Sequence, residues 1–377
     1  MSEDSGEQRT TVHTPAHPAP PNVERDEVGH YLVLLEGGEP GRRFLIGPGT
    51  TTLGRDAARD IVLADPDVSR LHACISVSFG RVIVEDQHST NGTFIDGREV
   101  TGAVVLSEGS ILIVGQQVLK LERRSKREVE RSQEIARDLD RASQYVRSLL
   151  PPPLAGGPIR TDWLLQPSAQ LGGDAFGYDW LDADTFVMYL LDVSGHGAGA
   201  AMHTVSALNV LRQRALTADL REPAEVLASL NTQFQMDRYD GMIFTMWYGV
   251  YHVAQRTLRY ACAGHHAAYV VSEEGIGRMA RPLGTRGLII GAMPDTRYRA
   301  AEMTMPAGSS LYLFSDGVFE IVTKEGRQWT LEDFTALLPR GTDDGLAESL
   351  RLYREVKAAA RPGPLDDDFS LLVVTFA

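Results

Sequence analysis

A highly charged segment divides the chain, and this division constrains the fold more than any other sequence feature. More than half of the residues from Arg123 to Arg141 are charged, and the segment contains no glycine. Such a segment cannot supply a hydrophobic core, so we expect the apolar residues on its two sides to form separate domains. A length of 377 residues also exceeds what one ordinary core accommodates. The sequence therefore predicts a multidomain protein.

The charged segment is itself predicted to be helical. Apolar residues recur at alternating four- and three-residue steps, which is the pattern of a coiled-coil seam. The seam residues are Ile135, Leu139, Ala142, Val146 and Leu149. Three prolines at 151–153 then end the helix. We predict a helical linker over residues 123–153, which acts as a solvated spacer, as a signalling helix, or as a parallel homodimer formed through residues 123–150.

The patterns on the two sides of this linker differ. Residues 1–28 are polar and proline-rich, which predicts a disordered tail. Residues 29–122 contain short β-like runs such as "YLVLLEGG", "RVIVEDQ" and "ILIVGQQVLKLE", separated by turns, and they predict an all-β sandwich. Residues 154–377 mix strand-like runs with predicted helices at Ala198–Arg214, Pro223–Phe234 and Gly345–Ala360. We expect an α+β layered domain there.

Composition excludes several classes of protein. The net charge of −13 disfavours nucleic acid as a partner. The two cysteines, Cys74 and Cys262, lie in strand-like contexts and predict small core residues of a reducing compartment, with no disulfide framework or zinc site. No signal peptide and no apolar run of about 18 residues is evident. We therefore predict a cytoplasmic protein without a membrane partner.

Aspartates stand at the ends of several apolar runs. They are Asp174 in "LGGDAFGYDW", Asp192 in "FVMYLLDVSGHGAGAAM", Asp316 in "LYLFSDGVFE" and Asp366–Asp368 in "LDDDFSLLVV". If these carboxylates converge at one end of a sheet, they repel one another and need cations. Oxygen ligands alone favour Mg²⁺ or Mn²⁺ over Zn²⁺. Two such ions can activate a water and clamp a phosphoryl group. The residue types alone leave ordinary Asp-Gly turns and a solvated loop as the alternative.

Two other motifs at the same turn fit less well. Gly195, Gly197 and Ala200 match the dinucleotide-binding pattern G-x-G-x-x-A, but no second strand ending in an acid follows about 20 residues later. A nucleophile elbow around Ser194 fails on spacing.

The five motifs "LGGDAFGYDW", "LLDVSGHGAGAA", "AGHHAAYV", "LYLFSDGVFE" and "DDDFSLLVV" occur in the order seen in a known family. The region from about residue 150 to 377 resembles the SpoIIE/RsbU-type bacterial phosphatases of the PPM superfamily. The resemblance implies an αββα sandwich that holds two Mn²⁺ or Mg²⁺ ions. By position, Asp192 would bridge both ions, the main-chain carbonyl of Val193 would bind the second, Asp316 and Asp367 would hold the first, and Asp174 would act on the second.

This sequence departs from the family pattern in three places. The segment "GGDAFGYDW" is one residue longer than the commoner form, so Asp179 is given no role. "GHH" at 264–266 replaces the frequent Gly-His-Pro. His196 is either a general acid or a packing residue of the turn.

The N-terminal region has a resemblance of its own. "TTLGRDAARDIVL", "DVSRLHACI" and "DQHSTNGTFIDG", within residues 29–122, are similar to a forkhead-associated (FHA) domain. The resemblance implies binding of a phosphothreonine, whose nearly two negative charges suit an arginine fork and hydroxyl donors. The residues assigned to it are Arg55, Ser69, Arg70, Thr90 and Asn91, with His72 bracing the loop.

Together these resemblances predict a signalling protein serine/threonine phosphatase. It would hydrolyse phosphoserine or phosphothreonine by attack of a hydroxide bound to two metal ions, with Asp192 and Asp316 as catalytic residues. An anti-sigma-factor antagonist is the substrate suggested by the family. The alternatives are a catalytically silent FHA scaffold with a phosphatase-like domain and, less favoured, a hydrolase of small phosphoesters.

Overall fold

The computed structural model describes residues 28–275, 277–340 and 346–377. The chain divides between Ile135 and Ala136 into two compact units. The predicted tail over residues 1–28 lies, apart from its last residue, outside the described residues. The predicted boundaries at 122, 153 and 154 stay predictions, since the division into compact units falls within the linker.

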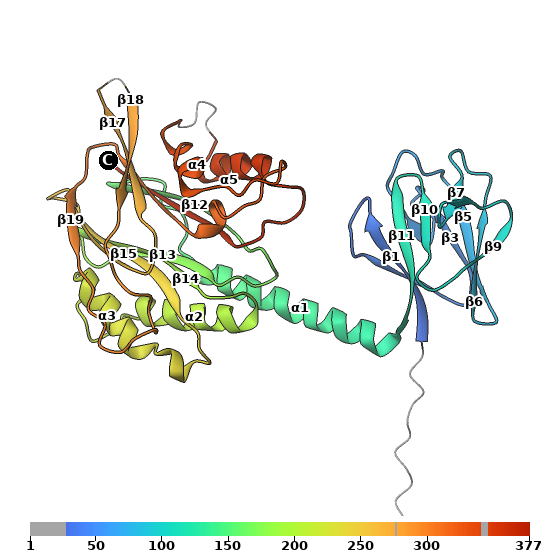
Figure 1. Ribbon diagram of the computed structural model, residues 1–377, viewed down its shortest axis with the longest axis horizontal. Helices are drawn as coiled ribbons and strands as arrows, with labels where there is room; N and C mark the ends of the chain where they lie inside the picture. Colours follow the sequence, from blue (N-terminus) through green and yellow to red (C-terminus); the bar gives the residue numbers. More distant parts are fainter. Residues whose placement is uncertain (1–27, 276, 341–345) are drawn as a thin grey trace, which may run out of the picture. The chain divides into compact units, whose positions relative to one another are not determined.

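The first unit is a β-sandwich of two sheets (Figure 1). One sheet has the order β2-β1-β11-β10-β7-β8 and comprises β1 (Val28–Glu36), β2 (Arg43–Ile46), β7 (Thr93–Ile95), β8 (Arg98–Glu99), β10 (Ile111–Val114) and β11 (Gln117–Ser125). The other has the order β4-β3-β5-β6-β9 and comprises β3 (Gly49–Gly54), β4 (Ile61–Val62), β5 (Ala73–Ser78), β6 (Arg81–Asp86) and β9 (Ala103–Leu106). Apolar residues from both sheets fill the space between them.

Turn chemistry explains the strand boundaries in this unit. Asp96 and Gly97 both have positive φ values, 49° and 78°, and they join β7 to β8 as the two-residue hairpin that Asp-Gly favours. The run "ILIVGQQVLKLE" is two strands rather than one, because Gly115 turns the chain between β10 and β11 with φ 59°.

The charged segment forms helix α1 (Lys126–Leu149). Its C-terminal seam residues are used within the second unit: Leu149 packs against the core there, and Val146 lines a small cavity. Ile135, by contrast, is 51% exposed. The helix is therefore present, whereas the coiled coil and the homodimer stay predictions.

The second unit consists of two five-stranded sheets with helices on their outer faces (Figure 1). The first sheet, in the order β13-β14-β15-β16-β19, comprises β13 (Asp174–Trp180), β14 (Thr185–Val193), β15 (Phe244–His252), β16 (Thr257–Ala263) and β19 (Ala301–Thr304). The second, in the order β12-β21-β20-β17-β18, comprises β12 (Ile159–Gln166), β17 (Ala268–Glu274), β18 (Gly277–Leu283), β20 (Ser310–Phe314) and β21 (Phe369–Phe376).

Helices α2 (Ala198–Arg212) and α3 (Pro223–Gln233) cover the first sheet, and α4 (Leu331–Thr335) and α5 (Glu348–Ala359) cover the second (Figure 1). Three short 3₁₀ turns, η1 (Met236–Arg238), η2 (Asp316–Val318) and η3 (Leu338–Arg340), complete the elements. One apolar core lies between the sheets and beneath α2 and α3, and another lies beneath α4 and α5. The predicted αββα sandwich and the all-β sandwich are both confirmed.

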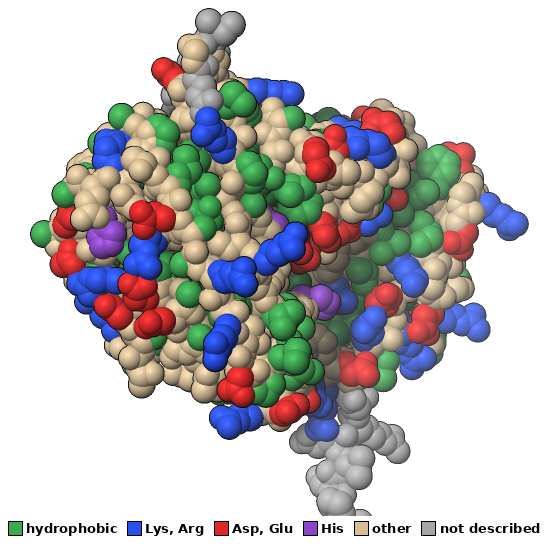
Figure 2. Space-filling model, turned by 60° about the vertical axis from the view of Figure 1, so that its left-hand side comes forward, with side chains coloured by type: hydrophobic (Ala, Val, Ile, Leu, Met, Phe, Trp, Pro, Cys, Tyr) green, Lys and Arg blue, Asp and Glu red, His purple; other side chains and the backbone are tan. Residues whose placement is uncertain are grey.

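Surface properties add two observations. Among the described residues, no helix combines the length and the apolar character needed to cross a membrane. On the face shown in Figure 2, acidic and basic side chains are interspersed rather than gathered into a basic patch.

Candidate functional site

Two aspartates face each other across neighbouring strands of the second unit. Asp174 begins β13 and Asp192 lies one residue before the end of β14, and the two are directly paired in the antiparallel ladder. Asp174 is 5% exposed. Burial, and then the charges of Asp192 and Asp368, raise the pKa of Asp174 well above its usual value. Burial, with the charges of Asp367 and Asp368, raises the pKa of Asp192 to about 6. The site therefore begins as a pair of desolvated acids.

The other sheet brings further acids to the same place. Asp316 opens η2 directly after β20, and Asp367 and Asp368 precede β21, the neighbour of β20 in the sheet. Burial, and then the charges of Asp192 and Asp367, raise the pKa of Asp316 to about 7. The amide of Gly173, next to Asp174, donates to the carboxylate of Asp368, so acids from the two sheets lie at one place. We call Asp174, Asp192, Asp316, Asp367 and Asp368 the acidic cluster.

The three consecutive acids have different environments. Asp366 is paired with Arg361 at the surface. Asp367 is exposed as a residue, yet its carboxylate is partly desolvated, which raises its pKa. Asp368 is buried and accepts hydrogen bonds from the amide of Gly173 at 2.7 Å and from Ser168, whose amide lies at 2.8 Å and hydroxyl at 3.0 Å. Asp368 thus ties the two sheets together, while Asp367 stays available.

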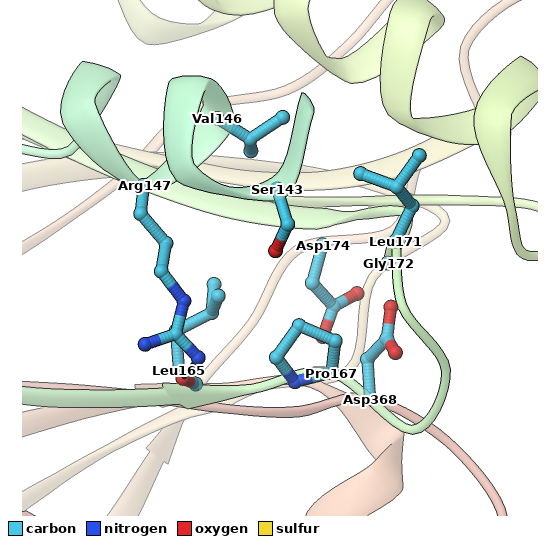
Figure 3. A pocket seen from close by; sticks show the side chains of 9 residues that line it. All are labelled: Ser143, Val146, Arg147, Leu165, Pro167, Leu171, Gly172, Asp174 and Asp368. Atoms are coloured by element: carbon cyan, nitrogen blue, oxygen red, sulfur yellow. Dashed lines mark hydrogen bonds between the residues drawn. The ribbon is translucent and has the colours of Figure 1, made fainter. Parts of the chain in front are cut away.

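Asp174 and Asp368 lie close to each other at a small cavity (Figure 3). Ser143, Val146 and Arg147 of α1 form the opposite side of this cavity. The Oδ2 atom of Asp174 is buried and has no hydrogen-bond partner within the described part of the chain. An unsatisfied buried carboxylate oxygen is costly, and a cation is one ligand that would satisfy it.

Glycines leave room for the carboxylates of the acidic cluster and for the backbone beside them. A Cβ atom on Gly172 would overlap the Asp368 carboxylate, and one on Gly173 would lie 2.5 Å from the carbonyl oxygen of Val193. Gly195 and Gly197, in the turn after β14, have φ values of 88° and 89° that favour glycine. The backbone therefore approaches the acids closely and turns directly into α2.

These observations fit a site for hard divalent cations. The donors are carboxylate and carbonyl oxygens, one of them an orphaned buried atom. Across the described ranges, no three acidic, histidine or cysteine side chains already converge as a ligand set. Carboxylates that share a site repel one another, so we expect the acidic cluster to close only around cations.

The histidines near the site differ in accessibility. His196 is exposed on the glycine turn, and its charge opposes the upward shift in the pKa of Asp367, which places it near that acid. His265 and His266 are half-buried, each with Nδ1 near a backbone carbonyl, and the ring of His266 contacts Phe314. Burial lowers the pKa of His265 to about 3, so this residue is a neutral packing group.

Sequence analysis missed one acid and left another without a role. The charge of Glu320 raises the pKa of both Asp192 and Asp316. Its position four residues after Asp316 was the available signal. Asp179 lies at the far end of β13 and forms a 2.9 Å ion pair with Arg214, which accords with giving it no part in the acidic cluster.

The first unit contains a basic pocket of about 520 Å³, which we call the FHA pocket. Its lining residues are Arg55, Asp56, Arg59, Ser69, Arg70, Leu71 and Thr90. The amide of Thr90 donates to Ser69 Oγ at 3.0 Å, and the two hydroxyls are 3.3 Å apart. Four of the five predicted residues therefore meet in one pocket, together with Arg59, which the sequence analysis did not assign.

Two further residues hold the loops of the FHA pocket. Asn91 lies outside the lining and donates from its amide nitrogen to the carbonyl of Asp67 at 2.8 Å. His72 is fully buried, accepts from the amide of Ser69 at Nδ1 and contacts the carbonyl of Gly92 through Nε2. His72 therefore braces the two loops that carry Ser69 and Thr90.

Models of known protein families match both parts of the chain. A family model described as stage II sporulation protein E (SpoIIE) matches residues 182–377, more than half of the chain. The chain belongs to the SpoIIE family. A second model, for the FHA domain, matches residues 51–115. The chain thus joins an FHA domain to a SpoIIE-type phosphatase domain.

Curated relatives match one part or the other. Phosphoserine phosphatase RsbP of Bacillus subtilis is 28% identical over 49% of this chain and 45% of its own length. Phosphoserine phosphatase RsbU of the same organism is 27% identical over 55% of this chain and 60% of its own. The FHA domain-containing protein FhaB of Mycolicibacterium smegmatis is 37% identical over 27% of this chain and 65% of its own. The chain spans about half the length of the two phosphatases.

A solved structure confirms the fold of the second unit. The SiaA-PP2C domain of Pseudomonas aeruginosa superposes with a TM-score of 0.55 at 21% identity, covering 65% of this chain and 98% of that one.

The packing around η2 leads to a first prediction. A Cβ atom on Gly317 would lie 2.2 Å from the carbonyl oxygen of Asp368, a backbone atom that cannot easily move away. We expect Gly317→Ala to lower the free energy of unfolding by about 1–3 kcal/mol, measured by urea denaturation. Gly199→Ala is the matched control, because no atom lies within 4 Å of a Cβ there and alanine favours a helix. Equal stability of the two variants would contradict the assigned packing.

Proposed function

We propose that this protein is a metal-dependent protein serine/threonine phosphatase whose FHA domain docks a phosphothreonine-bearing partner. The observation that carries the proposal is the acidic cluster, in which Asp174 pairs with Asp192 across β13 and β14 while Asp368, beside β21 of the other sheet, accepts from the amide of Gly173 at 2.7 Å. Membership of the SpoIIE family and the names of RsbP and RsbU, both phosphoserine phosphatases, support the same reaction.

Each residue of the site has a proposed role. Asp192 would hold both Mn²⁺ or Mg²⁺ ions. Asp316 and Asp367 would hold the first ion, and Asp174 and the carbonyl of Val193 would hold the second. When bound, two such ions supply an activated water and a clamp for phosphoryl oxygens. Asp368 positions the loop of Gly173 and the turn of Asp367 through its hydrogen bonds.

The turn after β14 contributes to phosphate binding. Helix α2 begins at Ala198, and its N-terminus has no side-chain cap. The first amides of the helix therefore receive no acceptor from a capping side chain, and a phosphate group would suit them. His196 beside Asp367 is exposed and could protonate the leaving hydroxyl.

The FHA pocket supports docking of a phosphorylated partner. Three arginines line it, and Ser69 and Thr90 supply hydroxyls, a set that matches the double charge and acceptor oxygens of phosphothreonine. We expect a phosphoprotein as substrate, and an anti-sigma-factor antagonist is the first to test.

Metal removal tests the reaction. The full chain, assayed for phosphate release from a phosphoserine or phosphothreonine protein, should be inactive after EDTA treatment and regain activity when Mn²⁺ or Mg²⁺ is restored. A sugar phosphate should be hydrolysed far more slowly. Absence of turnover on every phosphoprotein tried with Mn²⁺ would favour the silent scaffold, and unchanged turnover in EDTA would overturn the metal mechanism.

A further inference from the structure

A separate cavity of about 410 Å³ lies in the phosphatase domain. It is lined by the C-terminal ends of α1 and α2, by prolines 151 and 152, and by the parts of β13, β14 and β15 around Gly177, Tyr189 and Tyr248. Asp179 on its rim is five residues along β13 from Asp174, which corresponds to roughly 17 Å. The cavity is therefore distinct from the acidic cluster.

Two arginines line this cavity, and one of them has no anionic partner among the described residues. Arg214 is held by Asp179 at 2.9 Å and by the carbonyl of Trp180 at 2.9 Å. Arg212, also in the lining, forms no ion pair or hydrogen bond with any described residue. The net charge available to a ligand is therefore that of a single guanidinium.

A hydroxyl donor stands beside that guanidinium. Tyr189 is 5% exposed, and its hydroxyl, which lies over Gly177, makes no hydrogen bond with the described residues. Arg212 and Tyr189 both line the cavity, so the two groups face the same space. Burial raises the pKa of Tyr189, so the hydroxyl keeps its proton and can donate. Arginine and tyrosine together present the donors that a carboxylate accepts.

Apolar side chains form part of the remaining wall. Leu149 and Pro151 come from the end of α1 and the segment after it, and Leu211 comes from α2. These side chains would cover an apolar body, whereas a bare inorganic anion would leave them facing solvent.

We propose that this cavity binds a small hydrophobic anion, an apolar ring system bearing one carboxylate or sulfonate that Arg212 and the Tyr189 hydroxyl hold. The site is independent of the phosphatase reaction. It also takes its walls from α1 and from the β13–β14 hairpin, whose other end carries Asp174 and Asp192.

Two fluorescent probes with the same ring system test the charge requirement. Anilinonaphthalenesulfonate carries an anion, and phenylnaphthylamine does not. In the full chain, Arg212→Gln should weaken binding of the anionic probe at least about tenfold and change that of the neutral probe less than about twofold. Arg238→Gln, an exposed arginine elsewhere in the domain, is the matched control and should change neither. Naphthoate should displace the anionic probe, and inorganic phosphate should not.

A second variant tests the place of binding. Ser148 is exposed at the end of α1 and lines the cavity, so Ser148→Trp should fill the space without disturbing a core and abolish binding of both probes. Thermal unfolding would verify that the variants are folded. The proposal is overturned if neither probe binds the wild-type chain, if Ser148→Trp leaves binding intact, or if Arg212→Gln weakens both probes equally.

Discussion

Replacing Asp192 by asparagine is expected to lower the rate of phosphate release at least about a hundredfold. Loss of a residue that only hydrogen-bonds a metal ligand typically lowers activity about 10–100-fold, and loss of the ligand itself should cost more. The same change should stabilise the metal-free protein by an amount on the order of 2 kcal/mol, because it removes a desolvated charge whose pKa is raised to about 6. A raised carboxylate pKa costs stability above the unfolded-state pKa. The stabilisation of the metal-free protein by Asp192→Asn should therefore reach its whole value at pH 7.5 and vanish toward about pH 4. Phosphate-release assays and urea denaturation in EDTA measure the two effects.

Asp179→Asn is the matched control for Asp192→Asn. Asp179 lies on the strand that pairs with β14, but its carboxylate is exposed and bound to Arg214. Such a surface ion pair contributes little, so activity should be unchanged and stability should change by less than about 1 kcal/mol. Full Mn²⁺-dependent activity of Asp192→Asn would refute the proposed mechanism.

Much of the candidate site could be predicted from the sequence because its acids and glycines are neighbours in the chain. An acid at the end of an apolar run, followed by Gly195 and Gly197, predicted a strand, a tight turn and a helix, and the structure has β14, that turn and α2. Asp174 and Asp192 meet because β13 and β14 form a hairpin, whose loop sets the register. The approach of Asp368 from the other sheet to Gly173 depends instead on contacts between distant segments, which no local pattern specifies.

The division of labour among Asp366, Asp367 and Asp368 shows where sequence reasoning stops. All three are identical in type and adjacent, and only tertiary contacts distinguish them: an arginine for Asp366 and the loop of Ser168 and Gly173 for Asp368. The spacing of apolar residues along α1 has the same limit as a predictor. The seam left a solvated spacer and a partner helix both open, and it did not indicate that Leu149 packs against the core of the domain that follows or that Val146 lines a cavity there.

The largest effect on binding is expected from Arg55→Ala in the FHA pocket. Arg55 follows β3 at the mouth of the pocket, and its guanidinium can form two charge-assisted hydrogen bonds to a phosphate. Two such bonds are worth about 3 kcal/mol or more, so a phosphothreonine peptide should bind at least about a hundredfold more weakly. Isothermal titration calorimetry with the full chain measures this change. Phosphatase activity on a small phosphopeptide should stay unchanged, because Arg55 belongs to the other compact unit.

Arg81→Ala provides the comparison for Arg55→Ala. Arg81 is exposed on β6 and does not line the FHA pocket, so its loss removes the same charge from the same domain. Affinity should fall less than about twofold at physiological salt, where charges separated by more than a Debye length are screened. If both variants lost affinity equally, binding would depend on the overall positive charge of the domain rather than on the two hydrogen bonds from the Arg55 guanidinium. If neither did, the phosphothreonine assignment would be wrong, since Arg55 lines the same pocket as Ser69 and Thr90.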